Sequence, residues 1–131
     1  MASVVFVCLH NAGRSQMSQA LFDRAAKGRH TALSAGTRPA ARIHPEVIEV
    51  MGELGIDFSD RRPQLLTQEL AEQADVVVTM GCGDACPYIP GKRYLDWELP
   101  DPKGRTISEV RATRDEIARR VDSLVYELDT D

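Results

Sequence analysis

An apolar run that leads directly into a short loop of polar and small residues constrains this chain most. Residues Val4 to Val7 predict a buried β-strand. The residues after this strand form the predicted loop: Cys8, Leu9, His10, Asn11, Ala12, Gly13, Arg14 and Ser15. A helix that begins at Arg14-Ser15 would direct its positive dipole end, together with the loop amides, at one point. We therefore predict an oxyanion-binding loop with Cys8 as a nucleophile at its floor.

The residue types in this loop suit anion binding. Arg14 carries a planar guanidinium that can grip two oxygens at once. Asn11 tolerates the left-handed backbone of a tight loop, and Gly13 lets the backbone approach a ligand. The positive field and the Ser15 hydroxyl favour thiolate over thiol, so Cys8 is predicted to be ionised at neutral pH. A structural cysteine would need none of this chemistry, and the Gly-Lys-Ser/Thr ending of a nucleotide-binding P-loop is missing.

Length and composition narrow the class of protein. The 131 residues predict one domain, spanning 1–131. The formal net charge of −4 gives no electrostatic reason to bind nucleic acid. The chain shows no apolar stretch of membrane-spanning length and no export leader, which predicts a cytoplasmic protein that does not bind membranes. Three cysteines, an odd number, argue against a disulfide scaffold and favour thiol chemistry.

Apolar runs alternate with helical patterns along the chain, which predicts an α/β fold. We expect a small doubly wound sheet of four parallel strands with helices on both faces. The expected strands span 4–7, 31–35, 74–80 and 93–96, and the expected helices span 15–27, 45–54 and 65–72, with a long last helix that starts at the capping box 106–109. The carboxyl ends of parallel strands share one rim. The loops at 8–15, 81–87 and 99–102 should therefore meet there.

With these motifs the chain resembles the low-molecular-weight protein tyrosine phosphatase fold family, and more closely its arsenate reductase branch. Cys8-x5-Arg14-Ser15 matches the anion loop of the family. Ser34-Ala35-Gly36 matches a segment that follows the second strand, and Asp101-Pro102 matches the general-acid loop. The resemblance covers essentially the whole chain. Three further segments, 15–17, 81–87 and 96–98, resemble the actinobacterial arsenate reductases, which are coupled to thioredoxin or to mycothiol.

The resemblance implies the reduction of arsenate to arsenite. The Cys8 thiolate would attack arsenate held by Arg14 and the loop amides, while Asp101 protonates the departing oxygen. Phosphate and sulfate should compete. In an internal scheme Cys82 attacks the sulfur of the Cys8 adduct, Cys86 takes over the disulfide, and thioredoxin resets the enzyme. In an external scheme mycothiol attacks the adduct and a glutaredoxin-like partner resolves the mixed disulfide.

Two other function classes use the same residues differently. A phosphotyrosine phosphatase would employ Cys8, Arg14 and Asp101 with water completing the cycle. Phosphatases of the family place aromatic residues after the Asp-Pro pair, whereas Lys103-Gly104 follow here and favour a small inorganic oxyanion. A noncatalytic anion-sensing module would need none of the three catalytic elements. Redox coupling between Cys82 and Cys86 discriminates the reductase from both.

No metal and no tightly bound cofactor are expected. Thioredoxin-coupled relatives often hold a potassium ion beside the anion loop, with a glutamate on the first helix among its ligands. Gln19 stands at the corresponding position here, and Arg61-Arg62-Pro63 also depart from the pattern. A neutral amide and nearby guanidinium groups disfavour a monovalent cation.

Overall fold

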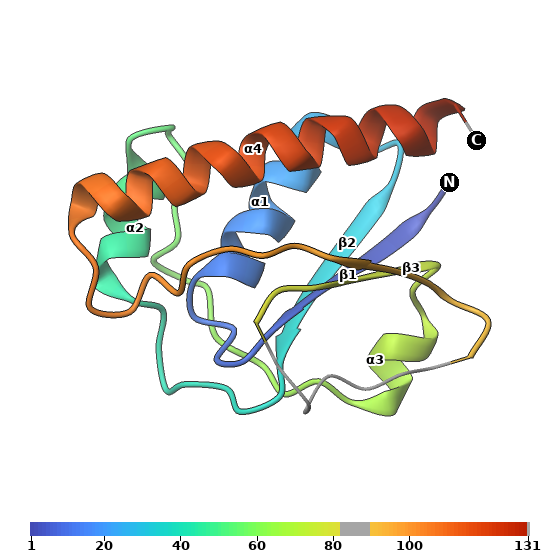
Figure 1. Cartoon of the computed structure of the whole chain (residues 1–131), viewed down its shortest axis with the longest axis horizontal. Helices are drawn as coiled ribbons and strands as arrows, with labels where there is room; N and C mark the ends of the chain where they lie inside the picture. Colours follow the sequence, from blue (N-terminus) through green and yellow to red (C-terminus); the bar gives the residue numbers. More distant parts are fainter. Residues whose placement is uncertain (82–89, 131) are drawn as a thin grey trace.

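The computed structural model describes residues 1–81 and 90–130, so Cys82 and Cys86 lie outside the described residues. Four parallel strands form one sheet in the order β2-β1-β3-β4, and Figure 1 labels the first three of them. The strands are β1 Ser3–Cys8, β2 Thr31–Gly36, β3 Val76–Thr79 and β4 Arg93–Asp96. The helices are α1 Arg14–Ala26, α2 Pro45–Gly52, α3 Gln68–Glu72 and α4 Ile107–Thr130. The predicted α/β class and the four-stranded parallel sheet are confirmed.

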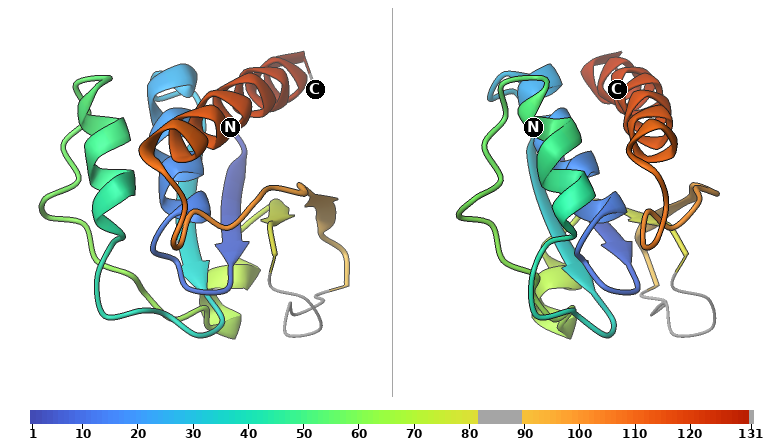
Figure 2. Two further views of the ribbon diagram at one scale, coloured as in Figure 1. Left: turned by 60° about the vertical axis from the view of Figure 1, so that its left-hand side comes forward. Right: turned by 90° about the vertical axis from the view of Figure 1, so that its left-hand side faces the viewer.

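Successive side chains of β1 point to opposite faces of the sheet, and each face forms its own apolar cluster. Val4 and Phe6 of β1 face α1, α2 and α4 and belong to the main core, where Phe6 packs edge-on against Phe22 of α1 with ring centroids 5.8 Å apart. Figure 2 shows α2, α1 and α4 gathered on this side. Val5 and Val7 point to the opposite face, where a smaller cluster forms with residues that flank α3.

Side-chain caps start α4 and α3, and the cap of α4 is the predicted capping box. At the start of α4, Thr106 Oγ1 accepts from the amide of Glu109 at 3.2 Å, and Glu109 Oε1 accepts from the amide of Thr106 at 3.2 Å. Thr67 caps α3 through the Leu70 amide at 3.2 Å. The prediction that this helix starts at Leu65 is wrong, because Leu65 forms a parallel bridge with Gly36 and so has extended backbone.

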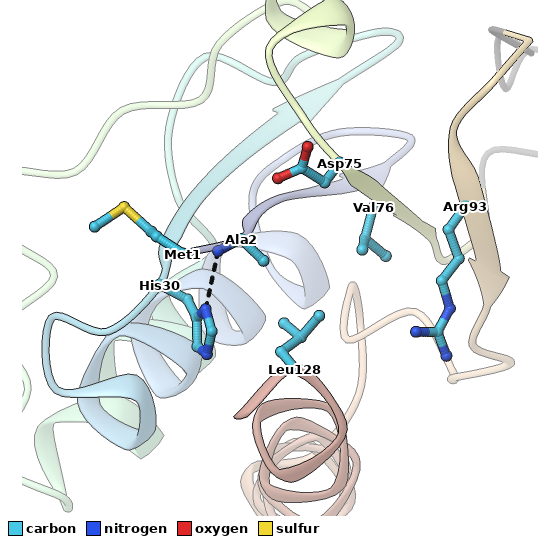
Figure 3. Close-up of a pocket in the computed structure, with 7 residues that line it drawn as sticks. All are labelled: Met1, Ala2, His30, Asp75, Val76, Arg93 and Leu128. Carbon is cyan, nitrogen blue, oxygen red and sulfur yellow. Dashed lines mark hydrogen bonds between the residues drawn. The ribbon is translucent and has the colours of Figure 1, made fainter. Parts of the chain in front are cut away.

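A pocket lies at the amino-terminal edge of the sheet, away from the predicted anion loop. His30 Nδ1 accepts from the amide of Ala2 at 3.0 Å, and His30 Nε2 lies 2.8 Å from Asp129 Oδ1. These contacts tie the start of β1 to the end of α4. Figure 3 shows the residues that line the pocket: Met1, Ala2, His30, Asp75, Val76, Arg93 and Leu128. No helix within residues 1–81 and 90–130 is long and apolar enough to cross a membrane.

At the end of α2, the carboxylate of Glu53 binds Arg111 and Arg114 of α4, and we call this interaction the Glu53 clamp. Glu53 accepts from Arg111 Nε at 2.8 Å and Nη2 at 2.7 Å, and from Arg114 Nη1 at 2.9 Å. Arg114 is buried and also donates to the carbonyl of Val50 at 2.7 Å. The hydrogen bonds from Arg111, reinforced by Arg114, lower the pKa of Glu53 from 4.5 to about 2.

The Glu53 clamp predicts a pH-dependent contribution to stability. Because the folded pKa lies below the unfolded one, the contribution is complete above pH 4.5 and is lost as the pH falls toward about 2. We expect Glu53→Gln to lower the melting temperature at pH 7 by about 2–5 °C. The difference from the parent protein should narrow below pH 4.5. Thermal melts followed by circular dichroism from pH 7 downward measure both effects.

Asp122→Asn is the matched control for this prediction, since Asp122 is an exposed acid on α4. It should leave the melting temperature unchanged at pH 7. Equal melting temperatures for the parent protein and Glu53→Gln at that pH would show that the clamp contributes nothing.

Candidate active site

The segment after β2, residues 37–44, holds the loop between β1 and α1 from outside. Amides of this segment donate to the carbonyls of Cys8, Leu9, His10 and Ala12, at 3.2, 2.8, 3.0 and 3.0 Å. In a trans peptide the next N–H points away from the carbonyl, so the amides that follow these carbonyls turn to the inside of the loop. The amide of Asn11 shows this orientation, because it donates to Cys8 Sγ at 3.3 Å.

Cys8 lies at the floor of this loop, at the carboxyl end of β1. Its side chain is buried, with the residue 2% exposed. The Ser15 hydroxyl, in the first turn of α1, lies 2.9 Å from the sulfur. Gly13 is the N-cap residue of α1 and brings no side-chain cap, which leaves the first-turn amides of the helix to a ligand. The structure therefore brings the Cys8 sulfur, the loop amides and the start of α1 together.

Asn11 holds the shape of the loop. Its φ angle of 51° places it in the predicted left-handed region. Its buried carboxamide donates from Nδ2 to Ser15 Oγ at 2.7 Å. Its Oδ1 accepts from Gln16 Nε2 and from the amide of Gln64, both at 2.9 Å. Because both ends of the carboxamide are used, the Asn11 side chain links the loop to α1 and to residue 64.

Arg14 is buried beside the loop, with 6% of the residue exposed. Its Nη1 donates to the carbonyl of Leu99 at 3.1 Å, and its Nη2 lies 3.7 Å from Asp101 Oδ2. Gly81 packs against the guanidinium, since a Cβ at this position would collide with Arg14 Nη1. The backbone of Gly81 also has a φ of +83°, which favours glycine. Two segments that follow β3 and β4 thus fix the orientation of Arg14.

Asp101 lies over the loop from the segment between β4 and α4. Its side chain is 40% exposed, and Oδ1 accepts from the amide of Lys103 at 3.0 Å. The adjacent Pro102 is buried against Gly13, where an added Cβ would come within 2.5 Å of Pro102 Cγ. His44 also lies near: burial lowers its pKa, and the Asp101 charge opposes that shift. The structure therefore brings Asp101 to the same site as Arg14.

The predicted meeting of three loops at one rim holds for the described residues. The loop after β1 and the segment at 99–102 meet at Arg14, and Gly81 brings the start of the third segment to the same guanidinium. Cys82 and Cys86 lie outside the described residues. Their predicted relay stays a prediction.

The segment between α2 and α3 contributes more to the site than the sequence analysis predicted. The carbonyl of Arg62 accepts from Gln16 Nε2 at 3.1 Å, and the amide of Gln64 donates to Asn11. Arg61 Nη1 donates to Gln19 Oε1 at 3.3 Å, and Ser34 Oγ donates to the same oxygen at 2.8 Å. The sequence analysis placed Arg61 and Arg62 near Gln19, but it did not identify the two backbone contacts, because the carbonyl of residue 62 and the amide of residue 64 are offered by almost any residue type.

Comparison with known proteins assigns the chain to a family. The family profile described as "Low molecular weight phosphotyrosine protein phosphatase" matches residues 3–131. The chain belongs to this family.

Several relatives in this family are named for arsenate reduction. A "Putative arsenate reductase" of Halobacterium salinarum is 42% identical over 96% of this chain and 92% of its own length. The solved thioredoxin-dependent arsenate reductase of Corynebacterium glutamicum is 41% identical with a TM-score of 0.84, and the match covers 99% of this chain and 62% of that chain. An arsenate reductase solved in the phosphate binding state is 31% identical with a TM-score of 0.86, covering 97% and 98% of the two chains.

The predicted resemblance to actinobacterial arsenate reductases is confirmed in part. The Corynebacterium structure agrees with it. The archaeal Halobacterium protein is similar at the same level, so the similarity is not confined to one lineage.

The contact between Gly81 and Arg14 predicts a specific loss of anion affinity. In Gly81→Ala the new methyl group would displace the guanidinium, and we expect phosphate binding to weaken by about tenfold or more. Isothermal titration calorimetry with inorganic phosphate measures the change.

Gly91→Ala is the matched control, because Gly91 has a similar φ of +86° but nothing within 4 Å of an added Cβ. It should carry the same backbone strain and keep the parent affinity. If both variants bind phosphate like the parent protein, Gly81 does not position Arg14.

Proposed function

We propose that this protein is an arsenate reductase that acts through the thiolate of Cys8. One observation carries the proposal: the buried Cys8 sulfur lies at the floor of a loop whose amides turn inward, with Arg14 and Asp101 beside the opening. Amides, a guanidinium and a helix N-terminus together recognise a tetrahedral oxyanion. The relatives named for arsenate reduction support arsenate as the substrate.

The first step forms a sulfur–arsenic bond. The Cys8 thiolate attacks arsenic, an arsenic–oxygen bond breaks, and protonated Asp101 supplies the proton with which the oxygen leaves as water. Arg14 and the inward loop amides hold the remaining oxygens and neutralise their charge. Asp101 is open to solvent, because its side chain is 40% exposed.

The second step supplies two electrons from thiols. In the internal scheme the Cys82 thiolate attacks Cys8 sulfur, and the electron pair of the broken sulfur–arsenic bond leaves with arsenic as arsenite. The Cys86 thiolate then attacks Cys82 and releases Cys8 as a thiolate. Thioredoxin reduces the Cys82–Cys86 disulfide. The thioredoxin-dependent Corynebacterium enzyme supports this scheme, and mycothiol with a glutaredoxin-like protein is the alternative source of electrons.

The surroundings of Asp101 favour a small oxyanion over a phosphotyrosine ring. The exposed residues Lys103 and Gly104 follow Pro102 and offer no aromatic surface. Trp97, the nearest preceding aromatic residue, packs in the core with its ring centroid 5.7 Å from that of Phe6. A phosphomonoester hydrolase is the second candidate, and the family description favours it.

No metal enters this proposal. Arg61 donates to Gln16 Oε1 at 3.2 Å and to Gln19 Oε1 at 3.3 Å. The side-chain oxygen of Gln19, where relatives have a glutamate that binds potassium, therefore already accepts from a guanidinium. Within the described ranges no group of three histidine, cysteine, aspartate or glutamate side chains is arranged to hold a metal ion.

An assay with separate reductants tests the proposed function. We expect purified protein to release arsenite from arsenate when thioredoxin and its reductase are supplied, with millimolar phosphate and sulfate competing. Cys8→Ser should abolish turnover because a serine hydroxyl does not ionise at neutral pH, and Arg14→Lys should fail because an ammonium makes no bidentate contact.

Two results would change the assignment. Turnover with mycothiol but not thioredoxin would establish the external scheme. Rapid hydrolysis of an aryl phosphate, with no arsenite formed by either thiol system, would make the protein a phosphatase.

A single turnover tests the proposed relay. With arsenate and no added thiol, we expect one disulfide per chain, between Cys82 and Cys86, because attack passes the bond outward from Cys8. Cys86→Ser should stall with Cys8 bonded to Cys82, and Cys82→Ser should form no disulfide at position 8. Peptide mapping by mass spectrometry locates the bonds. Full activity of both serine variants with mycothiol as sole thiol would remove both cysteines from the mechanism.

A further inference from the structure

Arg61 is a half-buried cation that the proposed reaction does not use. Its Nη1 donates to Gln16 Oε1 at 3.2 Å, and its Cζ lies 4.7 Å above the centre of the Phe58 ring. Burial lowers the pKa of Arg61, and the nearby charge of Asp23 opposes the shift. An arginine in this setting remains protonated at neutral pH. Its charge is therefore a fixed feature behind the anion loop.

A chain of hydrogen bonds runs from Arg61 to the nucleophile. Gln16 receives the bond from Arg61 and donates from Nε2 to Asn11 Oδ1 at 2.9 Å. Asn11 donates from Nδ2 to Ser15 Oγ at 2.7 Å. Ser15 Oγ lies 2.9 Å from Cys8 Sγ. Three side chains thus link the guanidinium to the sulfur, and all three are buried.

Each member of the chain has a defined direction. Gln16 Oε1 faces a donor that cannot accept, and Gln16 Nε2 also donates to the carbonyl of Arg62 at 3.1 Å. Asn11 Oδ1 faces the backbone amide of Gln64 at 2.9 Å, which leaves Nδ2 for Ser15. Because Ser15 Oγ accepts from Asn11, its own proton is free to point at the sulfur. Every bond therefore donates toward Cys8.

We propose that Arg61 is a positioning residue that raises the nucleophilicity of Cys8 through Gln16, Asn11 and Ser15, without contact with the substrate. Hydrogen bonds in such a chain polarise one another, and a cation at the far end strengthens each donor toward the sulfur. The stronger Ser15 hydroxyl bond stabilises the thiolate. The inference rests on the part of the proposed function that makes Cys8 the nucleophile.

The decisive comparison is Arg61→Met against Arg62→Met. Arg62 is exposed and contributes its backbone carbonyl to the chain, which the substitution keeps. The charged and titratable groups around the opening, which are Arg14, Asp101, His10, His44 and Lys103, are the same in both variants. The measurement is the rate of alkylation of Cys8 by iodoacetamide between pH 5 and 9, read by mass spectrometry on its peptide so that the other cysteines do not interfere.

We expect Arg61→Met to slow alkylation of Cys8 by about threefold to tenfold at pH 6 and to move the midpoint of the pH profile upward. Arg62→Met should follow the parent profile, and Arg61→Lys should restore part of the rate. The dissociation constant of inorganic phosphate should change by less than about twofold, because the loop amides and Arg14 keep their own partners. A role for Arg61 in the fold alone would weaken phosphate binding and slow alkylation together.

A double variant tests the path. Once Gln16→Met has interrupted the chain, adding Arg61→Met should cause little further loss, whereas independent effects would multiply. Arg61→Gln repeats the comparison with a neutral polar side chain if Arg61→Met does not fold. An Arg61 variant with the parent alkylation profile and a reactive Cys8 overturns the inference and leaves the proposed function intact. A Cys8 that reacts no faster than a free thiol in the parent protein removes the nucleophile on which the proposed function depends.

Discussion

The rest of the site depends on the hydrogen bonds made by the buried carboxamide of Asn11. It sits in a left-handed turn and satisfies Ser15, Gln16 and the amide of Gln64 at the same time. The turn allows the amide of Asn11 to reach Cys8 sulfur, and the anchored side chain prevents the loop from relaxing. A buried carboxamide with both ends paired is stable, whereas losing one partner would leave a polar group unsatisfied away from water.

The proposed attraction for anions has to be local, because the whole chain carries a formal net charge of −4. The loop concentrates amide dipoles, the start of α1 and the buried Arg14 at one end of the sheet. The Leu99 carbonyl and Asp101 hold the guanidinium of Arg14, and Gly81 leaves room for it because glycine has no side chain. These neighbours come from the segments after β3 and β4. The parallel sheet brings them together, since the carboxyl ends of its strands lie at one edge.

In both candidate functions, reductase and phosphatase, the proposed first step is the same attack by Cys8 on a tetrahedral centre, so the anion loop alone does not separate them. The groups that do separate them lie at the rim. Lys103 and Gly104 leave no aromatic wall beside Asp101, which suits an inorganic substrate. The second half of the reaction requires thiols as electron donors, and this is where the proposed roles of Cys82 and Cys86 enter.

The sequence by itself determined the α/β class, the loop from Cys8 to Ser15 and the capping box of α4, because strong local patterns encode all three. It misplaced the start of α3, since a long-range bridge between Leu65 and Gly36 outweighed local helix propensity. Only the tertiary structure decided which backbone groups surround the loop: the carbonyls of Arg62 and Leu99 and the amide of Gln64. Backbone donors and acceptors are nearly the same at every residue, so their roles depend on where the folded chain places them.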